Sequence, residues 1–310
     1  MWNAVQNDAL SKRLAAVHDA RIAVACIFRK GPNMLQVVFV KWGDRYGSDW
    51  VNRHVRAIRR HATGDVKFVC VTEERDETLD PEVRWHSFPQ FVSPYEYMLR
   101  NTRLKMSIFA PGVLEAEHPA LYLDLDSSVV GDVTRMEKHI AEDPDGLHML
   151  HGHFLPWLPV QRRFGYLLGD KYYHANGSAI GFVPQNFTHV FPLFNELIVG
   201  VEGDHLPKSH YADDRFLSCF CRESIRVFPT SLMVKYSHEY MAPLGIIERV
   251  RSRLPWVKTR RENLVAVSFP GKELKPDDLA KLEPGTEIRH EWLRGYWDQE
   301  AQVDYWREAA

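Results

Sequence analysis

Residues 120–132 read Ala-Leu-Tyr-Leu-Asp-Leu-Asp-Ser-Ser-Val-Val-Gly-Asp, an apolar run that ends in two carboxylates one residue apart. Leu121 and Leu123 predict a buried strand that stops at Asp124 and Asp126. Two unpaired carboxylates at the end of a buried strand repel each other, so each tends to hold a proton. A divalent cation removes that penalty, and Mg²⁺ or Mn²⁺ prefers oxygen ligands of this kind. The pair therefore predicts a metal site whose open positions can hold a diphosphate.

The same Asp-x-Asp pattern also has an ordinary structural explanation. Most such triplets are turns in which an Asp caps the following helix. The apolar strand before the pair and Val129-Val130-Gly131 after it favour the metal site. The triplet by itself leaves both interpretations open.

The composition is that of a globular protein with a sizeable core. The chain has 310 residues, of which 45% are hydrophobic and 26% charged. A net charge of −2 argues against a general nucleic-acid-binding protein. The first residues show no signal-peptide pattern, and the apolar runs are too short to span a bilayer. Four cysteines in apolar or helix-like runs suggest a reducing compartment, so we expect a cytoplasmic protein.

Strand-like and helix-like segments alternate through the first half of the chain. Strands are predicted at 35–41, 66–71, 83–88 and 121–124, with helices at 48–58, where Ser48 is the expected cap, and at 98–109. This alternation indicates a mostly parallel sheet covered by helices on both faces. Ligands of such sheets gather beyond the carboxyl ends of the strands, where Trp42, Gly43 and the two carboxylates fall.

The second half of the chain is less regular. Its patterns predict strands at 177–183, 225–228, 232–236 and 264–269, and helices at 186–198, at 211–222 and in the last twenty residues. A basic stretch at 245–261 carries six Lys or Arg residues against Glu248, with apolar residues between them. It is either a solvated helix or a segment facing an anionic acceptor or anionic lipid at the inner membrane face.

Seven separated segments carry a family resemblance. They are VFVKWGDRYG at 38–47, FVCVTE at 68–73, KMSIFAPG at 105–112, the segment at 121–132, NGSAIGF at 176–182, DDRFL at 213–217 and FPGKELKP at 269–276. In this order they resemble the bacterial GT-A glycosyltransferases that are similar to the retaining family 8 enzymes. The resemblance covers most of residues 22–276 and rests on the order of the motifs.

The resemblance implies an α/β fold of the GT-A type, with a Rossmann-like, mostly parallel sheet flanked by helices and a smaller irregular C-terminal region on the acceptor side. We expect one domain over 1–310. About 22–150 would bind the nucleotide sugar, about 151–276 would bind the acceptor and catalyse, and 277–310 would be helical. The implied activity is metal-assisted transfer from a UDP-sugar to a saccharide or lipid-linked acceptor, with retention, in polysaccharide biosynthesis.

The resemblance also implies roles for individual residues. The nucleotide would be contacted by Val40, Lys41, Trp42, Gly43 and Tyr46, and the rest of the donor by Lys105, Asp124, Gly271 and Lys272. The metal would be bound by Asp124 and Asp126. The reaction centre would be formed by Asn176, Asp213 and Asp214. Each type of residue also has a plain alternative. Trp42 can be a core aromatic, Lys105 can snorkel to the surface, and Asn176 and the Gly-Lys pair can belong to turns.

Two departures from the family pattern stand out. Pro270 replaces a metal-binding His, so we expect weak affinity for Mn²⁺ or Mg²⁺ unless a nucleotide supplies oxygen ligands. Asp214 replaces a Gln. Its carboxylate could attack the anomeric carbon, stabilise developing positive charge or accept a proton, or it could simply favour the start of a helix, as Asp213 could.

Two other functions are compatible with the sequence. In a phosphatase of the haloacid dehalogenase type, Asp124 would be the nucleophile, Asp126 the acid, Lys272 the motif lysine, and Asp213 and Asp214 the metal acids. In a degenerate transferase, the chain would bind a nucleotide sugar without turnover. The donor sugar, the acceptor and the oligomeric state have no readable signal in the sequence.

Overall fold

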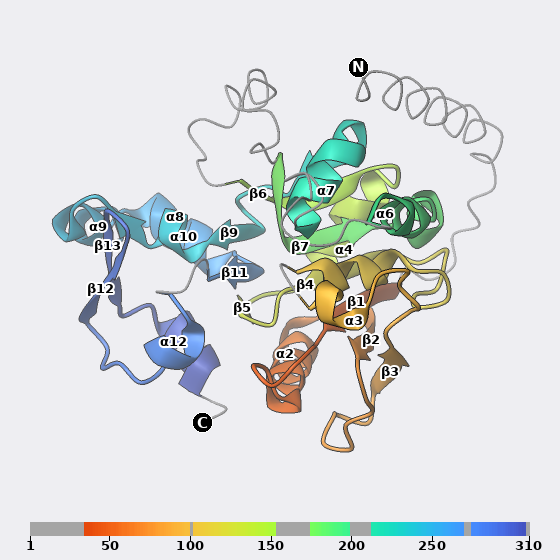
Figure 1. The fold of residues 1–310 in the computed structure, drawn as a ribbon. Coiled ribbons are helices and arrows are strands. Elements are labelled where there is room, and N and C mark those ends of the chain that lie inside the picture. Colours follow the sequence, from red (N-terminus) through yellow and green to blue (C-terminus); the bar gives the residue numbers. More distant parts are fainter. Residues whose placement is uncertain (1–33, 100–101, 153–173, 199–211, 270–273, 308–310) are drawn as a thin grey trace. The chain divides into compact units, whose positions relative to one another are not determined.

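Seven strands form the largest sheet of the described chain, in the order β3-β2-β1-β4-β7-β6-β8 (Figure 1). The computed structural model describes residues 34–99, 102–152, 174–198, 212–269 and 274–307. The strands are β1 (Met34–Val40), β2 (Asp65–Thr72), β3 (Val83–Ser87), β4 (Ala120–Leu123), β6 (Leu147–His151), β7 (Ala175–Phe182) and β8 (Ile225–Val227). β7 runs antiparallel to both its neighbours, and the other pairings are parallel. The predicted mostly parallel sheet is confirmed.

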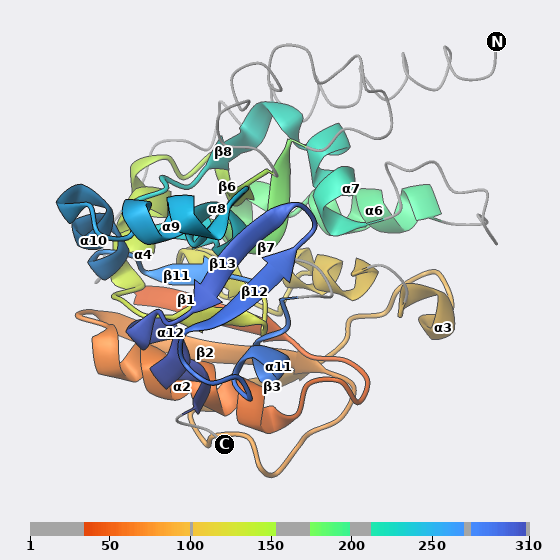
Figure 2. The same cartoon turned by 90° about the vertical axis from the view of Figure 1, so that its left-hand side faces the viewer.

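Helices and two small sheets complete the described chain. The helices are α2 (Ser48–His61), α3 (Tyr95–Met98), η1 (Arg103–Phe109), α4 (Thr134–Glu142), η4 (Pro184–Phe187), α6 (Val190–Ile198), α7 (Asp213–Phe220), η6 (Arg222–Ser224), α8 (Tyr236–Glu239), α9 (Gly245–Arg251), α10 (Pro255–Glu262), α11 (Pro276–Leu279) and α12 (Glu300–Arg307). The small sheets are β5 (Ser127–Val129)-β11 (Ala266–Ser268)-β9 (Met233–Lys235) and β10 (Met241–Ala242)-β13 (Leu293–Trp297)-β12 (Thr286–His290). Figure 2 faces the β12–β13 hairpin.

Helices cover both faces of the large sheet because alternate side chains of its strands point to opposite faces. Leu35, Val37 and Phe39 of β1 lie in one buried cluster with side chains of α2 and α4. Val38 and Val40 lie in a second buried cluster with side chains of η1, α6 and α7. The predicted covering of both faces is therefore confirmed.

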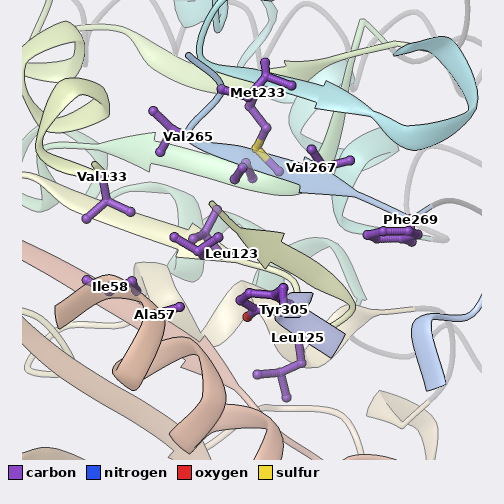
Figure 3. Packing of buried hydrophobic residues seen from close by; sticks show 14 of the residues in the cluster. Ala57, Ile58, Leu123, Leu125, Val133, Met233, Val265, Val267, Phe269 and Tyr305 are labelled. Atoms are coloured by element: carbon purple, nitrogen blue, oxygen red, sulfur yellow. The ribbon is translucent and has the colours of Figure 1, made fainter. Parts of the chain in front are cut away.

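The small sheet β5-β11-β9 extends the first of these clusters. Leu123 of β4, Val267 of β11 and Met233 of β9 are fully buried there with Ile58 of α2 (Figure 3). β5 begins directly after Asp126 and pairs antiparallel with β11. This pairing holds the far end of the loop that carries the two carboxylates.

Several predicted elements differ in the structure. The helix predicted at 98–109 is confirmed in part. The 3₁₀ helix η1 covers Arg103–Phe109, but α3 ends at Met98, and Thr102, with a φ of +66°, interrupts a regular helix before η1. The helix predicted from residue 186 begins at Val190, after η4. Ser48 is not the cap of α2, because Gly47 takes that place and the Ser48 hydroxyl donates to Asp76.

The C-terminal region also differs from its prediction. The hairpin β12–β13 occupies part of 277–310, which we expected to be helical, and α12 confirms the predicted final helix. Gly295 lets β13 pack closely, because a Cβ there would lie 2.6 Å from the Tyr240 carbonyl oxygen. Residues 34–310 group into one compact unit, and the finer division near 150 and 276 stays a prediction. None of the helices in the described ranges is long and apolar enough to cross a bilayer.

Candidate functional site

The loop after β4 holds two of the predicted residues at the carboxyl end of the sheet. The Asp124 backbone N–H donates to the Ser178 carbonyl oxygen of β7 at 2.9 Å. The Ser127 N–H donates to the Asp124 carbonyl oxygen at 3.0 Å, which closes a tight turn around Asp126. The turn therefore presents both carboxylates beside β7.

Asp124 is ion-paired with a buried lysine. Lys105 of η1 is 5% exposed, and its Nζ lies 2.6 Å from Asp124 Oδ1. The Tyr122 hydroxyl donates to the same oxygen. Burial raises the pKa of Asp124, but the Lys105 charge and these hydrogen bonds outweigh burial and bring the pKa below its usual value. Asp124 is therefore a carboxylate at neutral pH.

Asp126 is ion-paired with a second lysine. Lys275 Nζ lies 2.7 Å from Asp126 Oδ2, and the Tyr46 hydroxyl donates to that oxygen at 3.3 Å. Burial, and then the charge of Asp124, raise the pKa of Asp126 although Lys275 opposes this. The structure thus brings Tyr46 to the carboxylate pair, as part of the site.

Lys105 also connects the carboxylate pair to the start of α7. Its Nζ lies 3.8 Å from Asp213 Oδ2 and donates to the Gly177 carbonyl oxygen at 3.4 Å. The Thr102 hydroxyl donates to Asp213 Oδ1 at 2.5 Å. Burial by itself would lower the pKa of Lys105, but the negative charges of Asp124 and Asp213 outweigh burial and raise this pKa above its usual value. Two of the predicted motifs therefore meet at one ammonium group.

Gly177 is required by this arrangement. A Cβ at Gly177 would lie 1.9 Å from Asp213 Oδ2, a distance at which no side chain fits. Asn176 lies one residue earlier on β7, and its Oδ1 accepts a hydrogen bond from the Ser178 N–H at 3.2 Å. Gly177 thus lies against both Lys105 and Asp213, which the interpretation of the Asn-Gly pair as a plain turn does not explain.

Asp214 is half-buried next to Asp213, and the buried Lys235 is near enough for the two charges to interact. Burial, and then the charge of Asp213, raise the pKa of Asp214 to about 6. Lys235, at the end of β9, is 1% exposed, and burial lowers its pKa to about 8 although Asp214 and Asp124 oppose the shift. Sequence reasoning missed Lys235. Its signal was a lysine at the end of the apolar run predicted as a strand at 232–236.

The loop after β1 lies at the same edge of the sheet. Val40 is buried, and Trp42 packs half-buried against the cluster that contains it. The Lys41 N–H donates to the Val71 carbonyl oxygen at 2.9 Å. Gly43 has a φ of +59°, and its N–H donates to Glu73 Oε1 at 2.8 Å. Of this predicted set, the structure joins Tyr46 directly to the carboxylates.

The structure describes only part of the motif at 269–276. Pro270, Gly271 and Lys272 lie outside the described residues, so their predicted roles stay predictions. Lys275 of the same motif is described and reaches Asp126 across 149 residues of sequence. Lys275 was not among the predicted site residues, although its place just before Pro276 in the motif at 269–276 was a usable signal.

Asp124 and Asp126 fit a hard divalent cation as two of its oxygen ligands. In the ranges described above, no group of three or more His, Cys, Asp or Glu side chains converges as a metal site. Each carboxylate is neutralised by its lysine instead. A cation held here would therefore take its remaining ligands from a bound molecule or water, as Mg²⁺ readily does.

Comparisons with known proteins agree on the fold. No protein-family model matches this sequence, and no curated protein matches it. The galactosyltransferase LgtC, in a crystal structure with donor and acceptor sugar analogues, is 15% identical with a TM-score of 0.50. The match covers 78% of this chain and 89% of LgtC. The bifunctional glycosyltransferase WbbM, in its apo structure, is 11% identical with a TM-score of 0.51, over 81% of this chain and 48% of WbbM. The chain has the GT-A glycosyltransferase fold that the motifs implied.

Proposed function

We propose that this protein transfers a sugar from a UDP-sugar to a saccharide or lipid-linked acceptor. The observation that carries the proposal is the bridge made by Lys105, which joins Asp124 to Asp213 at the carboxyl end of the parallel strands. In a fold of this class that edge is where ligands bind. The bridge brings the proposed donor-binding pair and the proposed reaction centre to one point.

The lysines would bind the diphosphate of the donor. Lys105 and Lys275 each carry a positive charge held at a carboxylate, and an incoming diphosphate offers both of them additional oxygen partners. Preorganised positive charge beside a leaving diphosphate lowers the barrier to its departure. We propose that Gly271 and Lys272 contribute to the same contact.

Asp124 and Asp126 would hold Mn²⁺ or Mg²⁺ when the donor is present. The bound cation would add positive charge beside the diphosphate. Because each carboxylate already has a lysine partner, the chain alone offers little net attraction to a cation. We therefore propose that metal and nucleotide bind together, and that metal binds weakly without nucleotide.

The nucleotide base would lie at the loop after β1. Val40, Lys41, Trp42, Gly43 and Tyr46 are proposed to form this contact, with apolar surface from the aromatic rings and hydrogen bonds from the backbone. Tyr46 connects this loop to Asp126. A donor spanning the two would extend from the β1 loop to the carboxylate pair.

Asp213, Asp214 and Asn176 would act at the sugar. The bond from the anomeric carbon to the diphosphate breaks, and a bond to the acceptor oxygen forms as the hydroxyl proton leaves. Asp214 could attack the anomeric carbon, stabilise its positive charge or accept that proton. Retention of configuration is part of the proposal and rests on the resemblance to family 8.

Nucleotide binding is the first test of the proposal. UDP at 100 times its Kd should raise the free energy of unfolding by about 2.7 kcal/mol, since it binds the folded chain. We expect a higher Tm with UDP and Mn²⁺, a smaller rise with UDP and EDTA, and almost none with Mn²⁺ alone. ADP and GDP are the controls. No shift with UDP or UDP-sugars in any metal would contradict the proposal.

Turnover separates the proposal from its alternatives. Release of UDP that depends on an added acceptor would support transfer. Binding of UDP-sugars without hydrolysis or transfer would instead indicate a degenerate transferase. Hydrolysis of p-nitrophenyl phosphate with no effect of nucleotide would indicate a phosphatase. No observation of the described site favours that activity.

Replacing Asp214 by Asn should stabilise the fold at neutral pH and reduce activity. The pKa of Asp214 is raised to about 6 from 3.8, so its ionisation opposes folding as the pH rises through that value. We expect a gain of about 1 to 2 kcal/mol for Asp214→Asn at pH 7.5, reduced because the side chain is partly exposed. The gain should shrink to a small fraction by pH 4, because the difference in ionisation between the folded and unfolded states disappears as the pH falls from about 6 towards 3.8.

Urea unfolding at pH 7.5 and pH 4 measures this effect. Asp145→Asn, at an exposed aspartate, is the matched control and should change little at either pH. A loss of stability for Asp214→Asn at pH 7.5 would show that the carboxylate supports the fold rather than the reaction.

A further inference from the structure

An exposed apolar surface lies on α9, α10 and the tip of the β12–β13 hairpin. Six of the ten large apolar side chains that are exposed in the described residues gather there, each between 47% and 67% exposed: Leu244, Ile246, Ile247, Val250, Trp256 and Trp292. A folded surface rarely groups so many without a partner. We name these six residues and the exposed cations between them the α9–α10 surface.

One face of the helix α9 packs against the protein, and its other face is exposed to solvent. Ile246, Ile247 and Val250 lie at positions i, i+1 and i+4 and therefore share its outer face. Glu248 points inward and is 2% exposed. β10 pairs with β13, Ala242 opposite Arg294, and α9 lies beside β13 (Figure 2). The apolar residues of α9 thus lie beside the strand that follows Trp292.

The basic residues of 245–261 divide into two groups. Arg251, Arg260 and Arg261 are paired with the buried carboxylates of Glu239 and Glu248, so they hold the helices to the body of the protein. The positive charge that this stretch exposes to solvent is therefore smaller than its six basic residues suggested.

Arg249, Arg253 and Lys258 form the second group. All three are exposed, and none takes part in an ion pair within the described parts of the chain. The Arg249 guanidinium lies over the Tyr296 ring at 4.1 Å, which leaves its charge at the surface. In the sequence, these cations alternate with the exposed apolar residues of α9 and α10.

We propose that the α9–α10 surface docks on an anionic lipid bilayer. Apolar side chains would enter the boundary between headgroups and acyl chains, and the three cations would meet the phosphate groups. The charge selects this partner. The three cations outnumber the exposed acids of the same segments, Glu262 and Glu291, so an anionic bilayer is complementary to the surface, whereas two copies of it would bring an excess of like charge together. The proposal stands independently of the sugar-transfer reaction and, if both hold, favours a lipid-linked acceptor.

Sedimentation of the full chain with sucrose-loaded vesicles tests the proposal. Vesicles with 30% phosphatidylglycerol should bind at least about tenfold more protein than pure phosphatidylcholine, less so at high salt. Ile246→Gln/Trp256→Gln and Arg253→Glu/Lys258→Glu should each lower that binding about tenfold or more. The control is Val92→Gln, at a side chain that is 60% exposed and outside the surface, and it should bind as the wild type does.

Thermal unfolding first confirms that each variant is folded, which surface substitutions should allow. Equal binding to neutral and anionic vesicles, or no binding to either, would overturn the proposal. Light scattering that showed a dimer in solution, lost in Ile246→Gln/Trp256→Gln, would assign the surface to a second copy instead. Binding retained in both double variants would place the membrane contact elsewhere.

Discussion

Asp124→Asn is expected to lower kcat/KM for sugar transfer by about a thousandfold. The substitution keeps the shape of the side chain but removes the charge that pairs with Lys105 at 2.6 Å and that would hold the cation. The fold should survive, because Lys105 keeps Asp213 as a neighbour. Release of UDP in the presence of acceptor measures the loss.

Asp132→Asn is the matched control for this substitution. Asp132 ends the same segment and accepts hydrogen bonds from the hydroxyls of Thr63 and Thr134. Its change should lower stability by about 1 kcal/mol and leave kcat/KM within about threefold. Transfer by Asp124→Asn at a rate close to that of the wild type would remove the carboxylate pair from the proposed mechanism.

Lys105→Met should destabilise the fold by about 3 kcal/mol and abolish transfer. Lys105 is buried, and removing it takes away the cation that lies beside the carboxyl groups of Asp124 and Asp213 in the interior. The double variant Lys105→Met/Asp124→Asn should recover part of the lost stability, because one of the uncompensated charges is also gone. It should not recover activity. Urea unfolding and UDP release give the two readouts.

A lysine on the surface provides the comparison. Lys67 is paired with Glu115 at 2.8 Å, but its side chain is 53% exposed. Lys67→Met should therefore cost less than about 1 kcal/mol and leave transfer unchanged. If Lys105→Met were no more destabilising than Lys67→Met, the bridge between Asp124 and Asp213 would not be an important part of the fold.

Some residues of the site could be predicted from the sequence, and others could not. Asp124 and Asp126 were predicted because a run of apolar residues followed by paired carboxylates is a local pattern. Lys235 and Lys275 were not predicted, since a lysine carries no local sign that it will be buried beside an acid. Asp213 belongs to a motif that was predicted from the sequence. Only the folded structure shows that its carboxylate packs so closely against residue 177 that this residue must be a glycine.

The sequence by itself determined six of the seven strands of the large sheet, all except β6, and the position of the carboxylate pair at a strand end. Side-chain periodicity and the change from apolar to acidic residues act over a few positions, so they can be recognised without any partner. Tertiary structure alone decided which charges meet: Lys105 with Asp124 and Asp213, and Lys275 with Asp126. It also decided which arginines of 245–261 pair with the buried Glu239 and Glu248 and which cations have no acidic partner among the described residues. Such pairings join residues distant in sequence, and burial fixes them only when the whole chain is packed.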